Sequence, residues 1–257
     1  LDKGIPVFGF KNKTPVLLFR LMDILDDVFC PKTMVHGSLV EVFSVGILII
    51  GDSGIGKSEL TMELVGRGHL FVADDIVLIM RKLGHKLLGY GNQSVKGWIE
   101  IRGAGFIDIT KYFGVNRFKP ITEVEHVIFL YSEKNMKDKI ISAMKGLKLE
   151  ESKAKGMEVH PNEINLEDEK LLEEFKNVPD EKLADAEMMI YKRILKYSRE
   201  NRTYEGTYEG VILGRKVSIN PINIDRTKDV SIIVEAIASR YNSLKCQFEE
   251  PKEKLNI

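Results

Sequence analysis

Eight consecutive residues carry the strongest chemical signal in the chain: Gly51, Asp52, Ser53, Gly54, Ile55, Gly56, Lys57 and Ser58. Their spacing matches the phosphate-binding pattern GxxxxGK followed by Ser or Thr, in which backbone amides and a helix N-terminus surround phosphate oxygens. The lysine supplies positive charge to the outer phosphates, and the serine hydroxyl supplies an oxygen ligand for Mg²⁺. An apolar stretch at 46–50 precedes the motif and an apolar-periodic stretch at 57–65 follows it. This context favours a phosphate-binding loop over an ordinary glycine-rich turn.

Two adjacent carboxylates, Asp74 and Asp75, follow the next strand-like stretch, residues 69–73. The carboxyl ends of parallel strands meet at one edge of a sheet, so we expect these side chains beside the phosphate loop. One carboxylate there can hold Mg²⁺, and the other can accept a proton from an attacking hydroxyl. The alternative is a solvated turn, because Asp is common after strands.

Three further positions have both a chemical and a structural interpretation. His36 lies 21 residues before Lys57, and an isolated His is more often structural. Glu100 can join a metal site and Arg102 can contact phosphate, or the two can form a salt-bridged strand end. Arg202 lies in a mixed-charge segment, where an isolated basic residue is more often exposed to solvent.

These residues need a sheet to position them, and the hydrophobic pattern predicts one. Helices are predicted at 17–28, 57–65 and 229–244, with helical periodicity through much of 137–200. Strands are predicted at 38–43, 46–50, 69–73, 76–80, 98–101, 127–131 and 211–219. The segments 46–50 and 69–73, with the helix between them, are predicted to form a parallel βαβ unit. The fold class is therefore α/β, a P-loop domain with a mostly buried central sheet flanked by helices.

The composition limits the class of protein. The 257 residues include 38 Lys and Arg and 38 Asp and Glu, a balance that argues against a globally basic nucleic-acid binder. The apolar run around 45–50 is too short to span a membrane, and the two cysteines form no CxxC pair. We expect a cytoplasmic protein that binds neither nucleic acid nor membrane. Residues 150–189 hold 13 acidic and 5 basic residues, an acidic block between mildly basic flanks.

Taken together, His36-Gly37, the loop 51–58, Ala73-Asp74-Asp75 and Glu100-Ile101-Arg102-Gly103 resemble the catalytic domain of the HPr kinase/phosphorylase family. The resemblance implies a P-loop kinase that uses Mg²⁺ and ATP, or pyrophosphate, to phosphorylate a serine of the phosphocarrier protein HPr. It also implies phosphorolysis by inorganic phosphate in the reverse direction, a role in bacterial carbon catabolite regulation, and a homohexamer. Residues 1–30 resemble the end of an N-terminal domain with a linker helix, and 31–257 resemble the catalytic domain, ending in a helix at about 229–244.

The resemblance also assigns roles position by position. Residues 51–58 would bind the nucleotide phosphates, and Asp75 would be the general base in the forward direction and the general acid in reverse. The remaining active-site contacts would come from His36, Lys57 and Arg202, and the Mg²⁺ ligands from Ser58, Asp74 and Glu100.

Two departures from the family pattern bear on function. About fifty additional residues, within 137–200, separate the strand near Val127 from the Arg202 segment. They are predicted to be a solvated, partly helical insertion, and the alternative is a lid specific to a partner. The segment that the family ties to dephosphorylation retains only Arg226, with Asn223 in place of an arginine. This change argues against the phosphorylase activity more than against the kinase activity.

Two other functions stay open at this level. One is a small-molecule kinase, because the scaffold also resembles phosphoenolpyruvate carboxykinase. The other is a nucleotide-binding regulator with little turnover. The sequence does not distinguish ATP from pyrophosphate as donor, since the loop recognises phosphates alone.

Overall fold

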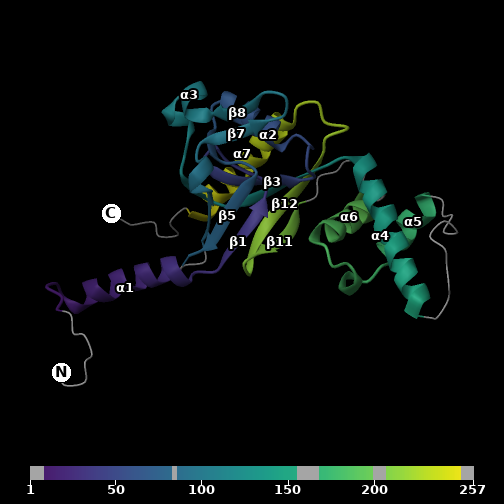
Figure 1. The fold of residues 1–257 in the computed structure, drawn as a ribbon, viewed down its shortest axis with the longest axis horizontal. Coiled ribbons are helices and arrows are strands. Elements are labelled where there is room, and N and C mark those ends of the chain that lie inside the picture. Colours follow the sequence, from purple (N-terminus) through teal and green to yellow (C-terminus); the bar gives the residue numbers. More distant parts are fainter. Residues whose placement is uncertain (1–8, 83–85, 155–167, 199–206, 250–257) are drawn as a thin grey trace, which may run out of the picture.

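The computed structural model describes residues 9–82, 86–154, 168–198 and 207–249. Figure 1 shows a β-sheet body with helix α1 (Thr14–Phe29) projecting from one side. Helices α4 (Glu133–Ala154), α5 (Asp168–Lys176) and α6 (Ala186–Ser198) gather at the other side, and we call these three the helical unit. Sheets flanked by helices confirm the α/β class that the sequence predicts.

The central sheet carries the phosphate loop at the end of one of its middle strands. Its order is β11-β12-β10-β3-β2-β4, with bounds Tyr208–Ile212, Arg215–Asn223, His126–Tyr131, Val45–Gly51, Ser38–Val42 and Leu70–Ala73. Strand β10 is parallel to both β3 and β12, whereas β2 is antiparallel to both β3 and β4.

The predicted βαβ unit is present with one difference. Helix α2 (Lys57–Gly66) connects β3 to β4, and these strands run in the same direction, but β2 lies between them. The reason is a hairpin: β2 and β3 are joined through Phe43 and Ser44, whose φ angles of 49° and 66° suit a tight two-residue turn. The strand carboxyl ends still share one edge of the sheet, so the loop and the Asp74-Asp75 pair remain neighbours.

Strand β3 is covered on both faces, which explains its uninterrupted apolar sequence. On one face, Ile47 belongs to an apolar cluster with Leu60 of α2 and Val234 of α7 (Val230–Glu249). On the other face, Leu48 belongs to a second cluster that extends to the helical unit. The loop therefore starts from one of the most deeply buried strands of the molecule.

The segment 76–80 does not continue the strand before it. It forms β5 (Ile76–Arg81) in a second sheet of order β1-β5-β6-β9, with β1 at Lys32–His36, β6 at Leu87–Gly91 and β9 at Ile121–Glu123. The chain changes sheet at Asp75, where the amide of Ile76 donates to the carbonyl of Asp74. Strands β7 (Trp98–Ile101) and β8 (Gly105–Asp108) form a separate hairpin before α3 (Ile109–Phe113), and 3₁₀ turns occur at Gln93–Val95, Val115–Arg117 and Asp180–Lys182.

The prediction of one strand over 211–219 is wrong. The chain forms two antiparallel strands there, β11 and β12, with Ile212 paired to Arg215. Leu213 and Gly214 make the turn with φ angles of 48° and 76°. Both arms alternate between buried and exposed side chains, so their pattern hides the two-residue interruption.

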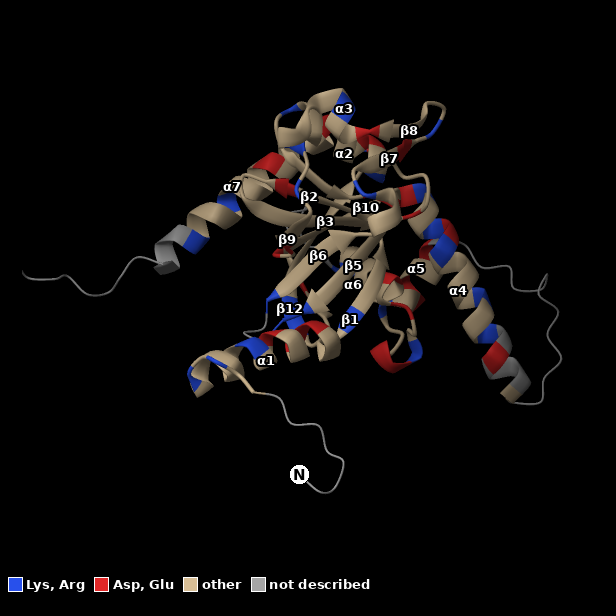
Figure 2. Ribbon diagram, turned by 60° about the vertical axis from the view of Figure 1, so that its left-hand side comes forward, with Lys and Arg blue, Asp and Glu red and all other residues tan. Residues whose placement is uncertain are grey.

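The helical unit is more than a solvated insertion. Leu171 and Phe175 of α5 are fully buried, and the ring of Tyr191 in α6 lies 5.7 Å from that of Phe129 in β10. These side chains share one apolar cluster with the central sheet, while acidic and basic residues are interspersed along the helices of the unit (Figure 2). The prediction of helices within 137–200 is confirmed, and their apolar stripe fixes them to the body.

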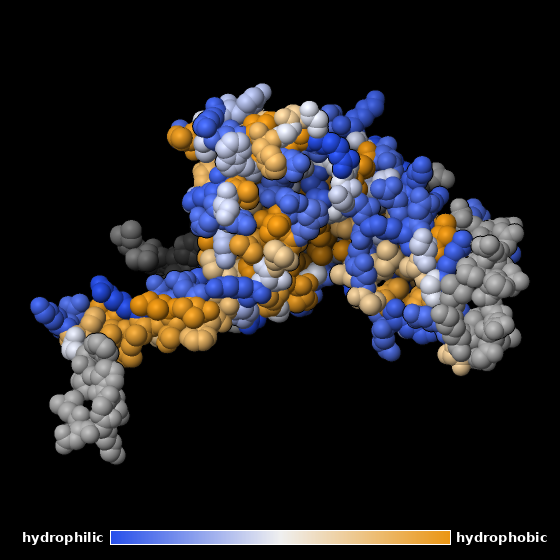
Figure 3. Space-filling view, in the orientation of Figure 1, coloured by the Kyte–Doolittle hydropathy of each residue, from blue (hydrophilic) through white to orange (hydrophobic). Residues whose placement is uncertain are grey.

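Helix α1 presents the largest apolar surface in Figure 3, as an orange face on the projecting arm. It has no buried residue, and its most exposed apolar side chains include Phe19, Val28 and Phe29. Among the described residues, no helix combines the length and apolar character that a membrane crossing requires.

Candidate phosphate-binding site

The loop between β3 and α2 has the backbone of an anion cradle. Gly51 has a φ of 148°, and a side chain there would place its Cβ 2.4 Å from the carbonyl oxygen of Leu130. Gly56 has a φ of 103° and immediately precedes α2. Both conformations favour glycine, and they direct the backbone into the helix N-terminus, where amide groups attract anions.

Lys57 lies under this cradle, with only 7% of its surface exposed. Its Nζ donates to the backbone carbonyls of Gly51, at 3.0 Å, and Asp52, at 2.9 Å. Burial lowers the pKa of Lys57, and the negative charges of Asp74 and Asp52 partly oppose that effect. The ammonium group is therefore held at the loop, where an incoming phosphate can exchange for the carbonyl oxygens.

Asp74 is a buried carboxylate that accepts two serine hydroxyls. The Oγ of Ser38, at the start of β2, donates to it at 2.5 Å, and the Oγ of Ser58, in the loop motif, donates at 2.8 Å. Burial raises the pKa of Asp74, while the hydrogen bonds from Ser38 and Ser58 partly offset the increase. The arrangement places a carboxylate and a hydroxyl oxygen together beside Lys57.

Asp75 has the opposite environment. It is 66% exposed, and its Oδ1 lies 3.1 Å from Nδ1 of His36. Its φ of 65° is unusual for a residue with a side chain, and its position between the bonded Asp74 carbonyl and Ile76 amide makes a γ-turn. Such a conformation costs about 1–3 kcal/mol and persists only where the surroundings impose it. The turn directs this carboxylate into open space at the end of β4.

A pocket of about 320 Å³ brings most of the predicted site residues together. Its lining includes His36, Ser53, Gly54, Gly56, Lys57, Ser58, Asp74, Asp75 and Glu100. Arg102 also lines the pocket, and its guanidinium group lies against Gly54, because a Cβ built there would meet Nη2 at 2.9 Å. The β7–β8 hairpin thus forms part of the pocket wall.

The oxygen ligands at this site suit a magnesium ion whose remaining ligands are waters and phosphate oxygens of the substrate. The described residues contain no cluster of three His, Cys, Asp or Glu side chains able to hold a metal by themselves. Mg²⁺ in phosphoryl-transfer sites commonly takes one or two carboxylates, with waters and phosphate oxygens completing the octahedron. The adjacent oxygens of Ser58 and Asp74 are ligands of that type, and Glu100 lies on the same pocket.

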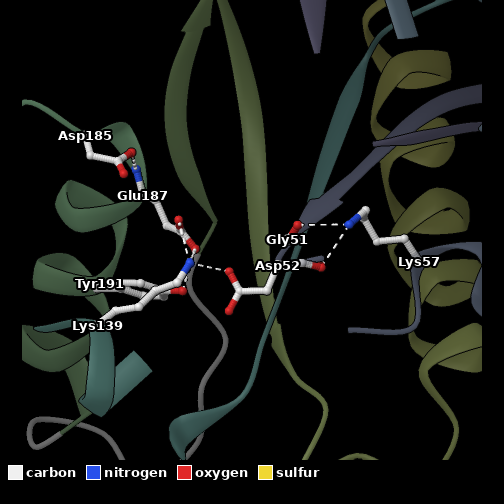
Figure 4. Close-up of polar contacts among 7 residues, drawn as sticks. All are labelled: Gly51, Asp52, Lys57, Lys139, Asp185, Glu187 and Tyr191. Atoms are coloured by element: carbon white, nitrogen blue, oxygen red, sulfur yellow. Dashed lines mark hydrogen bonds and ion pairs between the residues drawn. The ribbon is translucent and has the colours of Figure 1, made fainter. Parts of the chain in front are cut away.

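Three of the predicted site residues, Gly51, Asp52 and Ile55, are not part of the pocket lining. Gly51 and Ile55 act in the fold, Gly51 at the close approach to β10 and Ile55 as a buried side chain of the α2 cluster. The side chain of Asp52 points away from Lys57, toward the helical unit (Figure 4). Arg202 lies outside the described residues.

Two residues of the site were not predicted from the sequence. Ser38 carries no motif, and only the pairing of β2 with β4 brings it to Asp74. Lys139 contacts the side chain of Asp52 from α4. A contact over 87 positions of sequence leaves no local signal, so neither spacing nor composition could have identified it.

Comparisons with known proteins bear on this site. The family model described as HPr Serine kinase C-terminal domain matches residues 27–178. The HPr kinase/phosphorylase of Chloroherpeton thalassium is 42% identical over 129 residues, 50% of this chain and 38% of that protein. The enzyme of Treponema pallidum is 45% identical over 126 residues, 49% of this chain and 40% of that protein. This chain therefore spans about two fifths of the length of these relatives.

The fold has a solved counterpart. The structure of the Hpr(Ser) kinase/phosphatase from Coxiella burnetii matches with a TM-score of 0.53, over 84% of this chain and 93% of that chain. The sequence identity is 21%, so this likeness supports the fold alone.

Proposed function

The chain belongs to the HPr serine kinase C-terminal domain family, as its motifs predicted, and on this premise we propose that it transfers a phosphoryl group to a serine of the phosphocarrier protein HPr. The observation that carries the proposal is a single pocket that holds both halves of the reaction. Its lining includes Lys57 and Ser58 as a phosphate site and Asp75 as an exposed base.

In this proposal, the loop amides and Lys57 bind the phosphates of the donor. The donor is ATP or pyrophosphate, because the loop offers groups that recognise phosphate only. Ser58, Asp74 and Glu100 would hold Mg²⁺, which when bound neutralises charge on the phosphates. Arg102 adds a second positive charge at Gly54, on the pocket side of the loop. Together these groups lower the electrostatic cost of bringing a nucleophile to the outer phosphorus.

Asp75 accepts the proton of the attacking serine hydroxyl in this account. Its exposure lets a hydroxyl of another protein reach it, and His36 at 3.1 Å orients the carboxylate. Asp74 is unsuited to the same task, because it is buried and both serine hydroxyls already donate to it. The two adjacent aspartates therefore divide the work: Asp74 serves the metal and Asp75 moves the proton.

Forward transfer is the activity that the observations favour. Arg226, which matches a segment tied to dephosphorylation, pairs with Glu133 at 2.7 Å and is absent from the pocket lining. Asp225 accepts from Ser132 Oγ at 2.9 Å and from the amide of Glu133 at 2.8 Å, so it caps α4. This segment stabilises a helix here, and we propose that phosphorolysis by inorganic phosphate is the weaker reaction. Homohexameric assembly and a cytoplasmic location are part of the same proposal, on family grounds.

Incubation with labelled ATP or labelled pyrophosphate and purified HPr tests this function. Label on a serine of HPr is the predicted result. When inorganic phosphate is supplied to the labelled HPr, the label should be removed more slowly than it was transferred. Label found only on a small molecule would instead support a metabolite kinase. Nucleotide binding without transfer to either acceptor would support a regulator with little turnover.

A further inference from the structure

The first turns of α4 lie directly beside the phosphate loop. Strand β10 pairs with β3 so that Leu130 is opposite Gly51, the first residue of the loop motif. Helix α4 begins at Glu133, and Lys139 is six residues further, about 9 Å along the helix axis. The topology therefore brings this lysine to the outer side of the loop, opposite the pocket.

Lys139 contacts two carboxylates there. Its Nζ donates to Oδ1 of Asp52 and to both carboxylate oxygens of Glu187, at 2.9 and 3.0 Å (Figure 4). Glu187 is itself held in place, because Tyr191 Oη donates to it at 2.6 Å and its amide donates to Asp185 Oδ1 at 2.9 Å. The lysine thus joins a loop residue to α6 as well as to α4.

Asp52 is bound at two points by two lysines. Lys139 contacts its side chain, which is 12% exposed, and Lys57 donates to its backbone carbonyl at 2.9 Å. Although burial alone would raise the pKa of Asp52, its hydrogen bond with Lys139 and the charge of that lysine lower it. A carboxylate next to a phosphate site would repel the ligand if it turned inward or stayed unpaired.

Helix α4, which carries Lys139, is held in place on either side of this residue. Asp225 caps its first turn, and Ile140, the residue after Lys139, is fully buried. Lys139 is therefore presented by a rigid element, which distinguishes it from a lysine that samples many surface partners.

We propose that Lys139 is a positioning residue for the phosphate loop: it holds the Asp52 side chain outside the pocket and neutralises it, which makes the helical unit a working part of the phosphate site. The loop is then held from two sides, by Lys57 from within the motif and by Lys139 from α4. The inference rests on the proposed function only for its effect on phosphate binding. Its structural part, the coupling of α4 to residues 51–58, stands independently.

The test compares Lys139→Met with wild type in the full chain. We expect faster hydrogen exchange of the amides in residues 51–58 and magnesium pyrophosphate binding weakened about threefold to tenfold, in the lower part of the range of coupling between contacting residues. Lys139→Arg keeps the positive charge, so this variant should retain much of the wild-type amide protection and of the pyrophosphate affinity. In an Asp52→Asn background, Lys139→Met should produce little further change in exchange of residues 51–58, because the partner of Lys139 on the loop is already uncharged and its other partner, Glu187, lies on α6.

Lys148→Met is the matched control. Lys148 lies on the same helix and pairs with Glu174 of α5 at 2.7 Å, remote from the loop. The Lys148→Met variant should leave both the amide exchange of residues 51–58 and the binding of magnesium pyrophosphate unchanged. The proposal is overturned if Lys139→Met leaves exchange at the loop unchanged, or if Lys148→Met alters it equally. A wild-type chain that binds neither magnesium pyrophosphate nor magnesium ATP would refute the proposed function, whereas the exchange data would still decide the coupling.

Discussion

The two sides of the phosphate loop are built in different ways. On the pocket side, Ser58 belongs to the motif itself and Asp74 lies only 16 positions away, so local sequence assembles most of the site. On the outer side, Lys139 reaches Asp52 across 87 positions and Glu187 supports it from another helix. The pocket side therefore carries the groups that can contact a phosphate or a nucleophile, whereas the outer side can only affect the position and rigidity of the loop.

Substitutions on the two sides should therefore differ in their effect. The pocket side combines groups whose chemistry tolerates few replacements: a glycine cradle, an ammonium group, a hydroxyl and two carboxylates. The outer side requires only a positive charge presented by a rigid helix. We infer that changes to these groups on the pocket side should reduce transfer by orders of magnitude and that changes on the outer side should weaken it by small factors.

The largest expected effect comes from Asp75→Asn. Turnover on HPr should fall by about 10²–10⁴-fold, the usual contribution of a general base, while donor binding persists. The fold should be kept, because Asn tolerates the left-handed φ of 65° at this position at least as well as Asp. Steady-state transfer assays and a nucleotide titration measure the two quantities separately.

Glu59→Gln is the control for that variant, because Glu59 is a carboxylate that lines the same pocket and has no assigned role. Equal losses in the two variants would mean that pocket charge, and not proton transfer by Asp75, governs the rate.

A smaller effect is expected at the far end of α2, where the loop helix meets α7. Glu235 accepts from Arg67 at 2.9 and 2.6 Å and contacts His69 at 2.9 Å. The hydrogen bond from Arg67, with that from His69, lowers the pKa of Glu235 to about 2, against 4.5 ordinarily. Glu235→Gln should reduce the free energy of unfolding at pH 7 by about 1–2 kcal/mol, less than the full shift implies because Arg67 is partly exposed.

The pH dependence of this effect has a definite sign. A lowered pKa in the folded state stabilises the protein above pH 4.5, and that contribution is lost as the pH falls toward about 2. The difference between wild type and variant should therefore disappear over that interval in urea titrations. Pyrophosphate affinity should stay unchanged at neutral pH; a loss there would show that the helix end, too, determines the geometry of the loop.

The sequence allowed most of the pocket to be predicted. Lys57, Ser58, Asp74 and Asp75 were identified from a motif and its neighbours, because β3, the loop, α2 and β4 position them. Glu100 lies on the separate β7–β8 hairpin, and its role was assigned only through the family resemblance. His36 required the family resemblance, since nothing in the residues around it distinguishes a structural His from a functional one.

Other features depended on long-range pairing. The position of β2 between β3 and β4, the transfer of segment 76–80 to a second sheet and the β11–β12 hairpin all follow from strand partners, which alternation does not specify. The burial of Phe175 within an acidic block was hidden because charged neighbours dominate the local composition. Lys139 was missed for the same reason as Ser38: each reaches the loop region only through tertiary structure.

Calorimetric titration of magnesium pyrophosphate into wild type and Lys57→Ala tests the central claim most directly, because this ligand has no base or sugar to bind elsewhere. We predict a single site in wild type and about 10- to 100-fold weaker binding in the variant, the cost of losing a hydrogen bond from a charged group. Equal affinity in the two proteins would contradict the account, since the phosphates would then lie away from the loop of residues 51–58.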